Sequence, residues 1–351
     1  MANMAQAIRM ALAYGEQHLG VTDIFGEDVG PPLGGVFTAT QGLKTAWNAP
    51  LDERGILGAA YGLALAGQRP VAEIQFCDYI FNTIDLLKLI GNASWGCRGE
   101  YNLPLTVMTP VGAGIHGSIY HSHSFDAIMT HLPGWKIVMP STPIDAYGLM
   151  IAALKDSNPV MFMKPKALLR TKGEERIPGE PADDKALSQM IDAPLGDRSN
   201  WKPEWPALTD YTVEIGKAKI VKKGSHLTVV TYGRHVLIAK AAAEKLLAEG
   251  IDVEVLDLRS LFPYDWECVT ASIRKTKRVV FLNEDTSITN FGEHLLRRTI
   301  DELFYELEAR PRVLAGKHLP GVGLAPVLED NSVPQQHHVE QVLREVAADL
   351  I

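Results

Sequence analysis

Cysteine is scarce in this sequence, which has only Cys77, Cys97 and Cys268 among 351 residues. They lie far apart, are odd in number and form no CxxC pair, which argues against a disulfide framework and against a cysteine zinc site. A reducing compartment, the cytoplasm, is therefore the simpler expectation. Long apolar runs are also missing, because the longest, from Gly55 to Gly67, is shorter than the about 20 residues that cross a bilayer. We expect no membrane span.

An excess of basic charge is absent as well. The chain carries 42 acidic against 34 basic side chains, a formal net charge of −8. Such a chain has no general positive field for phosphate backbones or anionic lipid, so we expect it to bind neither bulk nucleic acid nor a membrane surface. Hydrophobic residues make up 46% of the chain and charged residues 22%, which is typical of a folded globular protein.

Helical and strand-like patterns alternate along both halves of the chain. Short β-branched runs such as 71–76, 105–110 and 160–165 are separated by helical patterns, for example from Asp78 to about Ser94. This alternation predicts right-handed crossovers and a mostly parallel sheet with helices on both faces. Five prolines among mixed charges then interrupt the pattern. We predict, in order, an α/β domain over 1–175, a linker or insertion over 176–206, and a smaller α/β domain over 207–351.

A glycine-rich stretch, VGAGIHG, has Gly112, Gly114 and Gly117 in GxGxxG spacing after a predicted strand. This spacing occurs in loops that bind a dinucleotide pyrophosphate. A dinucleotide fold also opens a helix inside the motif and ends the next strand on an acidic residue, and this sequence predicts neither. An NAD(P)-dependent oxidoreductase is therefore the less favoured alternative. We favour a flexible substrate loop in which glycine allows close approach of the backbone.

The same loop is rich in histidine, with His116, His121, His123 and His131 close together. Imidazole binds metals and exchanges protons near neutral pH. No zinc spacing such as HExxH accompanies these residues. Because the loop follows the carboxyl end of a strand, where open α/β sheets place their active sites, we expect at least one of the histidines to act in catalysis.

A third feature is the start of the apolar stretch PLDERGILGAAYGLALAG, where Asp52 is a candidate N-cap and Glu53 opens a helix that carries almost no other charge. The helix dipole favours a carboxylate in the first turn of many ordinary helices, so a structural role is one interpretation. The apolar stretch also predicts a buried helix. A desolvated Glu53 that exchanges a proton with a bound base is the second interpretation.

Taken together, several stretches resemble the β-subunit of the thiamin-diphosphate-dependent decarboxylase component of 2-oxo acid dehydrogenase complexes, of the branched-chain and pyruvate type. The resemblance covers nearly the whole chain. It implies an N-terminal pyrimidine-type thiamin-diphosphate-binding domain and a smaller C-terminal domain like that of transketolase. The matching stretches are FGEDVGPPLGGVF, PLDERGILGAAYGLALAGQRPVAEIQFCDYIF, IYHSHSFDA, PGWKIVMPSTPIDAYGL, DSNPVMF, VTYG and VEVLDLRSLFPYD.

The resemblance assigns roles to particular residues. It implies that Glu53 contacts the aminopyrimidine ring of thiamin diphosphate and that Leu51, Gln75 and Tyr79 line the pocket of that ring. It also implies that His121 acts on the decarboxylated intermediate and its transfer to a lipoyl group, with His116 as second candidate. Members of the family often bind a potassium ion. The positions that match its ligands are Leu103, Leu105, Thr106, Ala153, Asp156 and Asn158.

Half of a thiamin site is missing from the sequence. Thiamin enzymes hold the diphosphate through Mg²⁺ with a GDG motif that an asparagine pair closes further along the chain. Here Gly196-Asp197 is followed by Arg198, and no Asn-Asn pair occurs. The resemblance therefore implies a separate α-subunit that holds the diphosphate and Mg²⁺, in an α2β2 heterotetramer with the cofactor between the subunits. This chain by itself would not decarboxylate a 2-oxo acid.

The leading hypothesis is a branched-chain 2-oxo acid dehydrogenase β-subunit that passes the acyl group to the lipoyl domain of an acyltransferase core protein. A pyruvate or acetoin dehydrogenase β-subunit, and a non-catalytic assembly subunit, are the alternatives. The chain departs from the family pattern at His123, at Phe125-Asp126 and at MKPK (163–166). We expect these departures to alter the rim of the active site.

Overall fold

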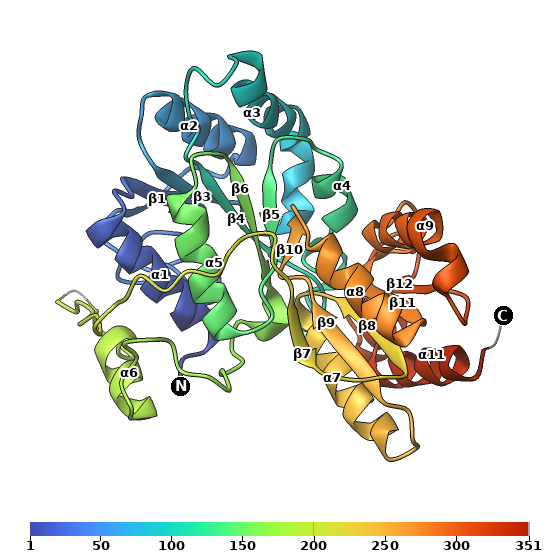
Figure 1. The fold of residues 1–351 in the computed structure, drawn as a ribbon. Helices are drawn as coiled ribbons and strands as arrows, with labels where there is room; N and C mark the ends of the chain where they lie inside the picture. Colours follow the sequence, from blue (N-terminus) through green and yellow to red (C-terminus); the bar gives the residue numbers. More distant parts are fainter. Residues whose placement is uncertain (199, 350–351) are drawn as a thin grey trace. The chain divides into compact units, whose positions relative to one another are not determined.

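The computed structural model describes residues 1–198 and 200–349, which form two compact α/β units (Figure 1). The first unit contains residues 1–110, 132–164 and 168–215. The second contains residues 111–131, 165–167 and 216–351, of which the last two lie outside the described part. The predicted α/β class with mostly parallel sheets is confirmed.

The first unit is built on a sheet whose strands are ordered β5-β6-β4-β3-β1-β2. β1 pairs in parallel with β2 and with β3, β3 pairs with β4, and β5 pairs with β6. Every residue of β3, β4 and β6 is buried, which explains their continuous apolar runs. The strands are β1 (Asp23–Gly26), β2 (Ala46–Asn48), β3 (Pro70–Glu73), β4 (Thr106–Val111), β5 (Lys136–Val138) and β6 (Val160–Pro165).

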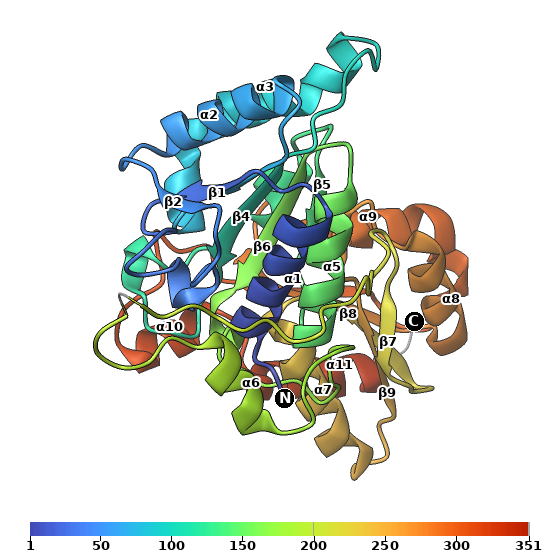
Figure 2. The same ribbon diagram turned by 90° about the vertical axis from the view of Figure 1, so that its left-hand side faces the viewer.

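Helices cover this sheet, and α1 and α5 lie side by side against it (Figures 1 and 2). A capping box between Asn3 and Gln6 starts α1, and Thr142 followed by Pro143 starts α5. None of the helices in the described ranges combines the length and apolar character of a membrane span. The helices are α1 (Met4–His18), α2 (Glu53–Leu65), α3 (Ile84–Gly96), α5 (Pro143–Lys155), α6 (Asp184–Ile191) and the 3₁₀ helices η1 (Val36–Thr38), η2 (Cys77–Thr83) and η4 (Lys166–Leu168).

Two local expectations need correction. The helix expected from Asp78 to about Ser94 begins as the 3₁₀ helix η2 and becomes α-helical only at Ile84. The segment expected to lack a regular pattern contains α6, which packs through Leu187 and Ile191. The buried Arg9 binds this segment by donating to the carbonyl of Ile191 (2.9 Å) and by pairing with Asp192. A long-range contact of this kind leaves no periodic signal in the segment itself.

The second unit has a sheet of order β12-β11-β8-β9-β7, in which only β7 runs antiparallel among the pairs described. Its core packs β8, β9 and β11 against α7 and α11. The strands are β7 (Lys219–Lys222), β8 (Leu227–Thr231), β9 (Val253–Asp257), β10 (Ser260–Phe262), β11 (Val279–Thr286) and β12 (Arg312–Gly316). The helices are α4 (Asp126–Thr130), α7 (Arg234–Leu247), α8 (Trp266–Thr276), α9 (Phe291–Leu303), α10 (Pro326–Ser332), α11 (Gln336–Ala348) and the 3₁₀ helices η3 (Ser118–Tyr120) and η5 (Phe304–Glu306).

The departures from the family pattern at 125, 126 and 164 lie in the interior of the chain, and the expectation that they alter an active-site rim stays a prediction. Phe125 is 2% exposed, and Asp126 and Lys164 are fully buried. Lys164 on β6 pairs with Glu73 on β3, and both side chains are fully buried. A buried charge persists only with a partner, and the two residues satisfy each other.

Candidate active site

Glu53 occupies the first position of α2 and is 8% exposed. Asn82, just before α3, donates from its amide Nδ2 to Glu53 Oε2 at 3.2 Å. Asp52 stands at the N-cap position as expected, but its side chain makes no capping hydrogen bond. The N-terminal helix dipole therefore acts on Glu53, a carboxylate that is almost closed to solvent.

A second carboxylate, Glu27, follows the carboxyl end of β1. Its Oε1 is buried and has no hydrogen-bond partner among the described residues. Burial, and next the negative charges of Glu53 and Asp28, raise the pKa of Glu27. Because unpaired buried oxygens are costly, Glu27 and Glu53 together favour a ligand that carries positive charge or a ring nitrogen that can be protonated.

The other predicted pocket residues lie in the same unit. Gln75 donates from Nε2 to Asp28 Oδ2 at 2.9 Å. Burial, followed by the charges of Asp78, Glu27 and Glu53, raises the pKa of the Tyr79 phenol, so this side chain remains an O–H group. Leu51, two residues before Glu53, is 80% exposed. The acidic group is therefore sheltered, while an apolar side chain beside it is open to a partner.

Sequence reasoning missed Glu27, Asp28 and Asn82. A signal for the first two was present, because the acidic pair in FGEDVG directly follows a predicted strand, and sites in parallel sheets gather at the carboxyl ends of strands. Asn82 had no such signal, since its contact with Glu53 depends on how η2 leads into α3.

The residues expected to bind potassium surround the start of β4 and the end of α5. Leu105 accepts from the Val160 amide (2.9 Å), and Ala153 accepts from the Asp156 amide (3.2 Å). The Asp156 carboxylate pairs with Lys136 and accepts from the Asn158 amide (2.9 Å). Each of these carbonyl oxygens keeps a second lone pair, whereas the Asp156 carboxylate is already paired, so a cation site here stays a prediction.

In the second unit, the histidine loop (Val111–His131) contains the GxGxxG glycines. The side chain of another residue occupies the space where a Cβ of each glycine would lie. A Cβ at Gly112 would lie 2.2 Å from Glu284 Oε1, and one at Gly117 would lie 2.8 Å from the Cβ of His121. The motif leads into the three-residue η3 and not into a helix that could receive a pyrophosphate. This geometry favours close backbone approach over dinucleotide binding.

The predicted histidines of this loop are held in different ways. His121 Nδ1 lies 3.1 Å from the carbonyl of Gly117. His116 has a left-handed backbone (φ 55°), and its Nδ1 lies 3.5 Å from Glu329. In the described ranges no three His, Cys, Asp or Glu side chains gather in a way that could hold a metal ion.

Asp126 of this loop forms a buried acidic pair with Asp285. Asp126 accepts hydrogen bonds from Ser124 and from the Tyr232 phenol (2.8 Å), and Asp285 accepts from the Ala127 amide (3.0 Å). Burial, and next the charge of Asp285, raise the pKa of Asp126 to about 8, and burial raises the pKa of Asp285 to about 6. Near neutral pH the raised pKa values therefore favour a proton held within this pair.

Replacing Asp126 with asparagine is expected to stabilise the protein increasingly as the pH rises. The native Asp126 pKa of about 8 lies above the usual 3.8, so the folded chain binds an extra proton between these values and loses stability as the pH rises through them. Asparagine does not titrate, and it can still bond Ser124 and Tyr232. The advantage should grow by up to about 1.4 kcal/mol per pH unit. Calorimetry from about pH 5 to about pH 8.5 measures it.

The matched control is Asp330→Asn, which neutralises an exposed carboxylate of the same unit. It should change the melting temperature little at every pH. An Asp126→Asn advantage that does not depend on pH would contradict the buried-proton interpretation.

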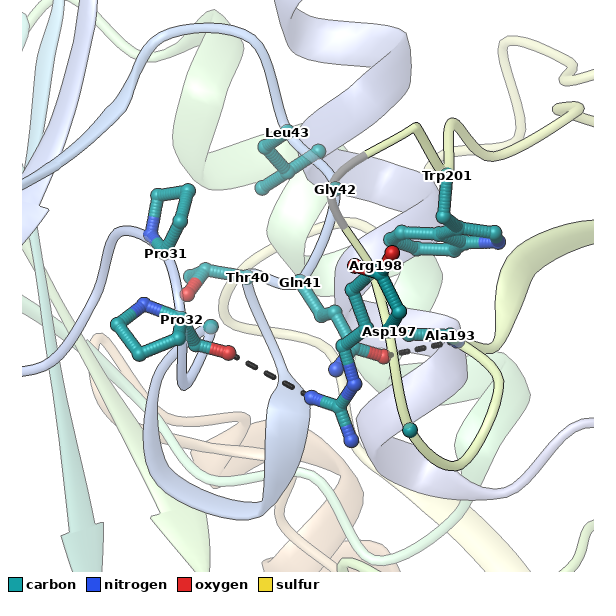
Figure 3. A pocket seen from close by; sticks show the side chains of 12 residues that line it. Pro31, Pro32, Thr40, Gln41, Gly42, Leu43, Ala193, Asp197, Arg198 and Trp201 are labelled. Carbon is teal, nitrogen blue, oxygen red and sulfur yellow. Dashed lines mark hydrogen bonds between the residues drawn. The ribbon is translucent and has the colours of Figure 1, made fainter.

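A pocket of about 610 Å³ in the first unit lies beside the loop that follows β1 (Figure 3). Pro31, Pro32, Leu43 and Trp201 give it a mostly apolar lining. Arg198 contacts the Pro32 carbonyl (3.5 Å) across it, and Gln41 Oε1 accepts from the Ala193 amide (3.2 Å). Its polar groups are thus engaged with the protein. Gly196 and Asp197, the partial GDG match, belong to this pocket.

Comparisons with known proteins bear on this arrangement. The family described as "Transketolase, pyrimidine binding domain" matches residues 1–172, and "Transketolase, C-terminal domain" matches residues 216–339. A solved structure titled "Split gene transketolase, inactive beta4 tetramer" has a TM-score of 0.71 to this chain at 19% identity, and the match covers 100% of both chains. At that identity the likeness is evidence for the fold alone.

Curated relatives are more similar in sequence. The 2-oxoisovalerate dehydrogenase subunit beta of Pseudomonas aeruginosa is 37% identical over 326 residues, which is 90% of this chain and 87% of the relative. The protein of the same name from Bacillus subtilis is 35% identical, over 92% of each chain. The pyruvate dehydrogenase E1 component subunit beta of Bacillus subtilis is 34% identical, over 87% of each chain.

Proposed function

Because this chain belongs to the family of 2-oxo acid dehydrogenase β-subunits, we propose that it is the β-subunit of a thiamin-diphosphate-dependent decarboxylase component acting on branched-chain 2-oxo acids. The observation that carries the proposal is the sheltered carboxylate of Glu53 at the start of α2, beside Glu27, whose Oε1 has no hydrogen-bond partner within 1–198 and 200–349. Such a site suits the aminopyrimidine half of thiamin diphosphate, which has a basic ring nitrogen. Bound thiamin diphosphate supplies the carbon nucleophile and the electron sink for decarboxylation.

The residues of this chain then have distinct tasks. Glu53 holds a proton at the ring nitrogen and exchanges it, which a carboxylate with little access to water does without competition from solvent. Asp28 fixes the amide of Gln75, which lines the pocket of the ring. Tyr79 and Leu51 supply ring and methyl surfaces for the pocket. His121, whose Nδ1 contacts the Gly117 carbonyl, takes part in proton transfer during acyl transfer to a lipoyl group.

A separate α-subunit completes the site, in an α2β2 heterotetramer. It holds Mg²⁺ and the diphosphate, for which this sequence has no complete motif. The open face of α2 supports a partner there. A Cβ at Gly58 or at Gly62 would meet no described atom within 4 Å beyond the adjacent residues and the backbone of α2, and Leu51 and Leu65 are 80% and 45% exposed. Small residues on an exposed helix let another polypeptide approach closely.

The experiment that tests this division is a comparison of the chain alone and with its α-subunit. The isolated chain should release no CO2 from any 2-oxo acid in the presence of thiamin diphosphate and Mg²⁺. Mixing in the α-subunit should give both turnover and a heterotetramer by light scattering. Robust turnover by the isolated chain would refute the proposal.

The acyl group passes to a lipoyl acyltransferase core protein. A pyruvate dehydrogenase β-subunit is the second candidate, favoured by the 34% identity to the Bacillus subtilis protein of that name. Rates of the reconstituted pair on branched-chain 2-oxo acids and on pyruvate separate the two.

The three cysteines are free, which supports a cytoplasmic location.

A potassium ion would bind the carbonyl cluster of Leu103, Leu105, Thr106 and Ala153, next to Asp156 and Asn158. The buried positions of the first four support a structural role for the ion. A melting temperature that rises with KCl and not with equal NaCl is the expected sign, and equal effects of the two salts would argue against it.

A further inference from the structure

The histidine loop has little secondary structure of its own to hold it in place. Its regular elements are η3 and the five-residue α4. His116 and Ser118 have left-handed backbones, with φ of 55° and 64°. Such a segment holds one conformation only when surrounding groups impose it, because these backbone states are disfavoured in isolation.

Three carboxylates of the second unit impose that conformation by accepting hydrogen bonds from loop amides. Glu284 Oε2 accepts from the amide of Ala113 at 3.0 Å, and Glu329 Oε2 accepts from the amide of His116 at 2.9 Å. Asp285 Oδ2 accepts from the amide of Ala127 at 3.0 Å. Two of the bonds thus fall near the beginning of the loop and one near its end, on either side of His121.

These carboxylates are themselves buried and oriented. The side chains of Glu284 and Glu329 are 7% and 2% exposed, and Asp285 is 6% exposed. Arg234 lies 3.8 Å from Glu284, and the Thr286 amide donates to Asp285 at 2.8 Å. Hydrogen bonds to charged acceptors are stronger than neutral ones, and a buried carboxylate that lost its donor would pay a desolvation penalty.

The anchored backbone leads directly to His121. The Gly112 amide donates to the carbonyl of His123 at 2.7 Å, which closes the loop on itself. Gly117 carries the carbonyl that meets His121 Nδ1, one residue after the amide that Glu329 holds. A shift of the backbone at His116 therefore moves the group that orients the His121 ring.

We propose that Glu284, Asp285 and Glu329 are positioning residues that hold the histidine loop and, through it, the imidazole of His121. The part of the proposal that concerns His121 rests on the proposed function. The positioning of the loop by the three carboxylates is a property of this chain alone, and it can be measured on the chain without an α-subunit.

The first test is hydrogen exchange on the full-length chain with Glu329→Ala and Glu329→Gln. Loss of the carboxylate should raise the exchange of amides in 113–127 by about 10-fold or more in Glu329→Ala, while β8 amides keep their protection. Glutamine retains an acceptor oxygen, so Glu329→Gln should recover part of the protection. The matched control is Glu340→Ala, which removes a buried carboxylate of the same unit that binds Lys245 and not the loop.

The second test is kinetic and uses the reconstituted heterotetramer. Glu329→Ala should lower kcat for acyl transfer to a lipoyl domain by roughly 10-fold to 100-fold, because small displacements of a catalytic group have effects of this size. The KM for the 2-oxo acid should stay nearly constant. Added to His121→Ala, Glu329→Ala should have no further effect, because the two act through one group.

The outcomes separate the two claims. Unchanged exchange at 113–127 in Glu329→Ala overturns the positioning role, whatever the activity. Raised exchange together with a fully active His121→Ala supports the positioning of the loop and overturns the role proposed for His121. Additive losses in the double variant overturn the claim that Glu329 acts through His121.

Discussion

Glu53→Gln is expected to lower kcat of the reconstituted enzyme by roughly 10²-fold to 10⁴-fold, the usual contribution of a positioned acid–base group. Glutamine keeps the shape and the bond from Asn82, but it cannot hold an exchangeable proton at a ring nitrogen. Since substrate binding does not depend on that proton, the KM for the 2-oxo acid should change little. Steady-state decarboxylation, with circular dichroism to verify folding, measures the effect.

The chain offers a matched control for this variant in the adjacent residue. Asp52→Asn removes the same charge from the N-cap position, where the side chain makes no capping bond. It should retain nearly full activity. Near-normal turnover by Glu53→Gln, or equal losses in the two variants, would show that Glu53 is a structural first-turn carboxylate of α2.

The second large effect is on stability. Lys164→Met should lower the free energy of unfolding by about 3–5 kcal/mol, because it leaves the Glu73 carboxylate charged and unpaired in the interior. Both side chains are fully buried, and the other oxygen of Glu73 accepts a long 3.3 Å bond from the Val36 amide. Urea denaturation followed by circular dichroism measures the loss.

Two further variants test the cause. Adding Glu73→Gln to Lys164→Met should recover most of the stability, because the second change removes the stranded charge. Lys155→Met is the control. It breaks an exposed pair with Asp210 and should cost no more than about 1 kcal/mol. Equal losses for Lys155→Met and Lys164→Met would contradict the role of burial.

Much of the parallel α/β architecture could be predicted from the sequence, because the periodic signals are local. The apolar run from Gly55 to Gly67 predicts α2, and the runs at 105–110 and 160–165 predict β4 and β6 almost to the residue. Glu53 was identifiable as a candidate because helix start, charge and apolar context coincide within a few residues.

The grouping of the histidine loop with the second unit could not be predicted in this way. The bonds that hold it join residues 171 and 213 positions apart, and no periodicity records such pairs. The pairing of Lys164 with Glu73 could not be predicted for the same reason. In the sequence Lys164 is one basic residue in MKPK, and only the sheet order brings it to Glu73.

The glycine motif shows how spacing alone can mislead. Gly112 and Gly117 stand in dinucleotide spacing, yet each glycine is needed because Glu284 or His121 occupies the space of its missing Cβ. The spacing indicates that other atoms approach the glycine backbone closely, but the sequence does not show that these atoms belong to Glu284 and His121.

The interleaving of the two units has a practical consequence for cutting the gene. A fragment that starts at Gly216, near the boundary of the matched transketolase C-terminal domain, would retain Glu284, Asp285 and Glu329 and would lose residues 111–131. Three acceptors that are normally covered by backbone amides would then face water or each other. A fragment cut at that boundary contains the carboxylates without the loop that they bind. Residues 111–131 and 216–351 are therefore best expressed as parts of one chain.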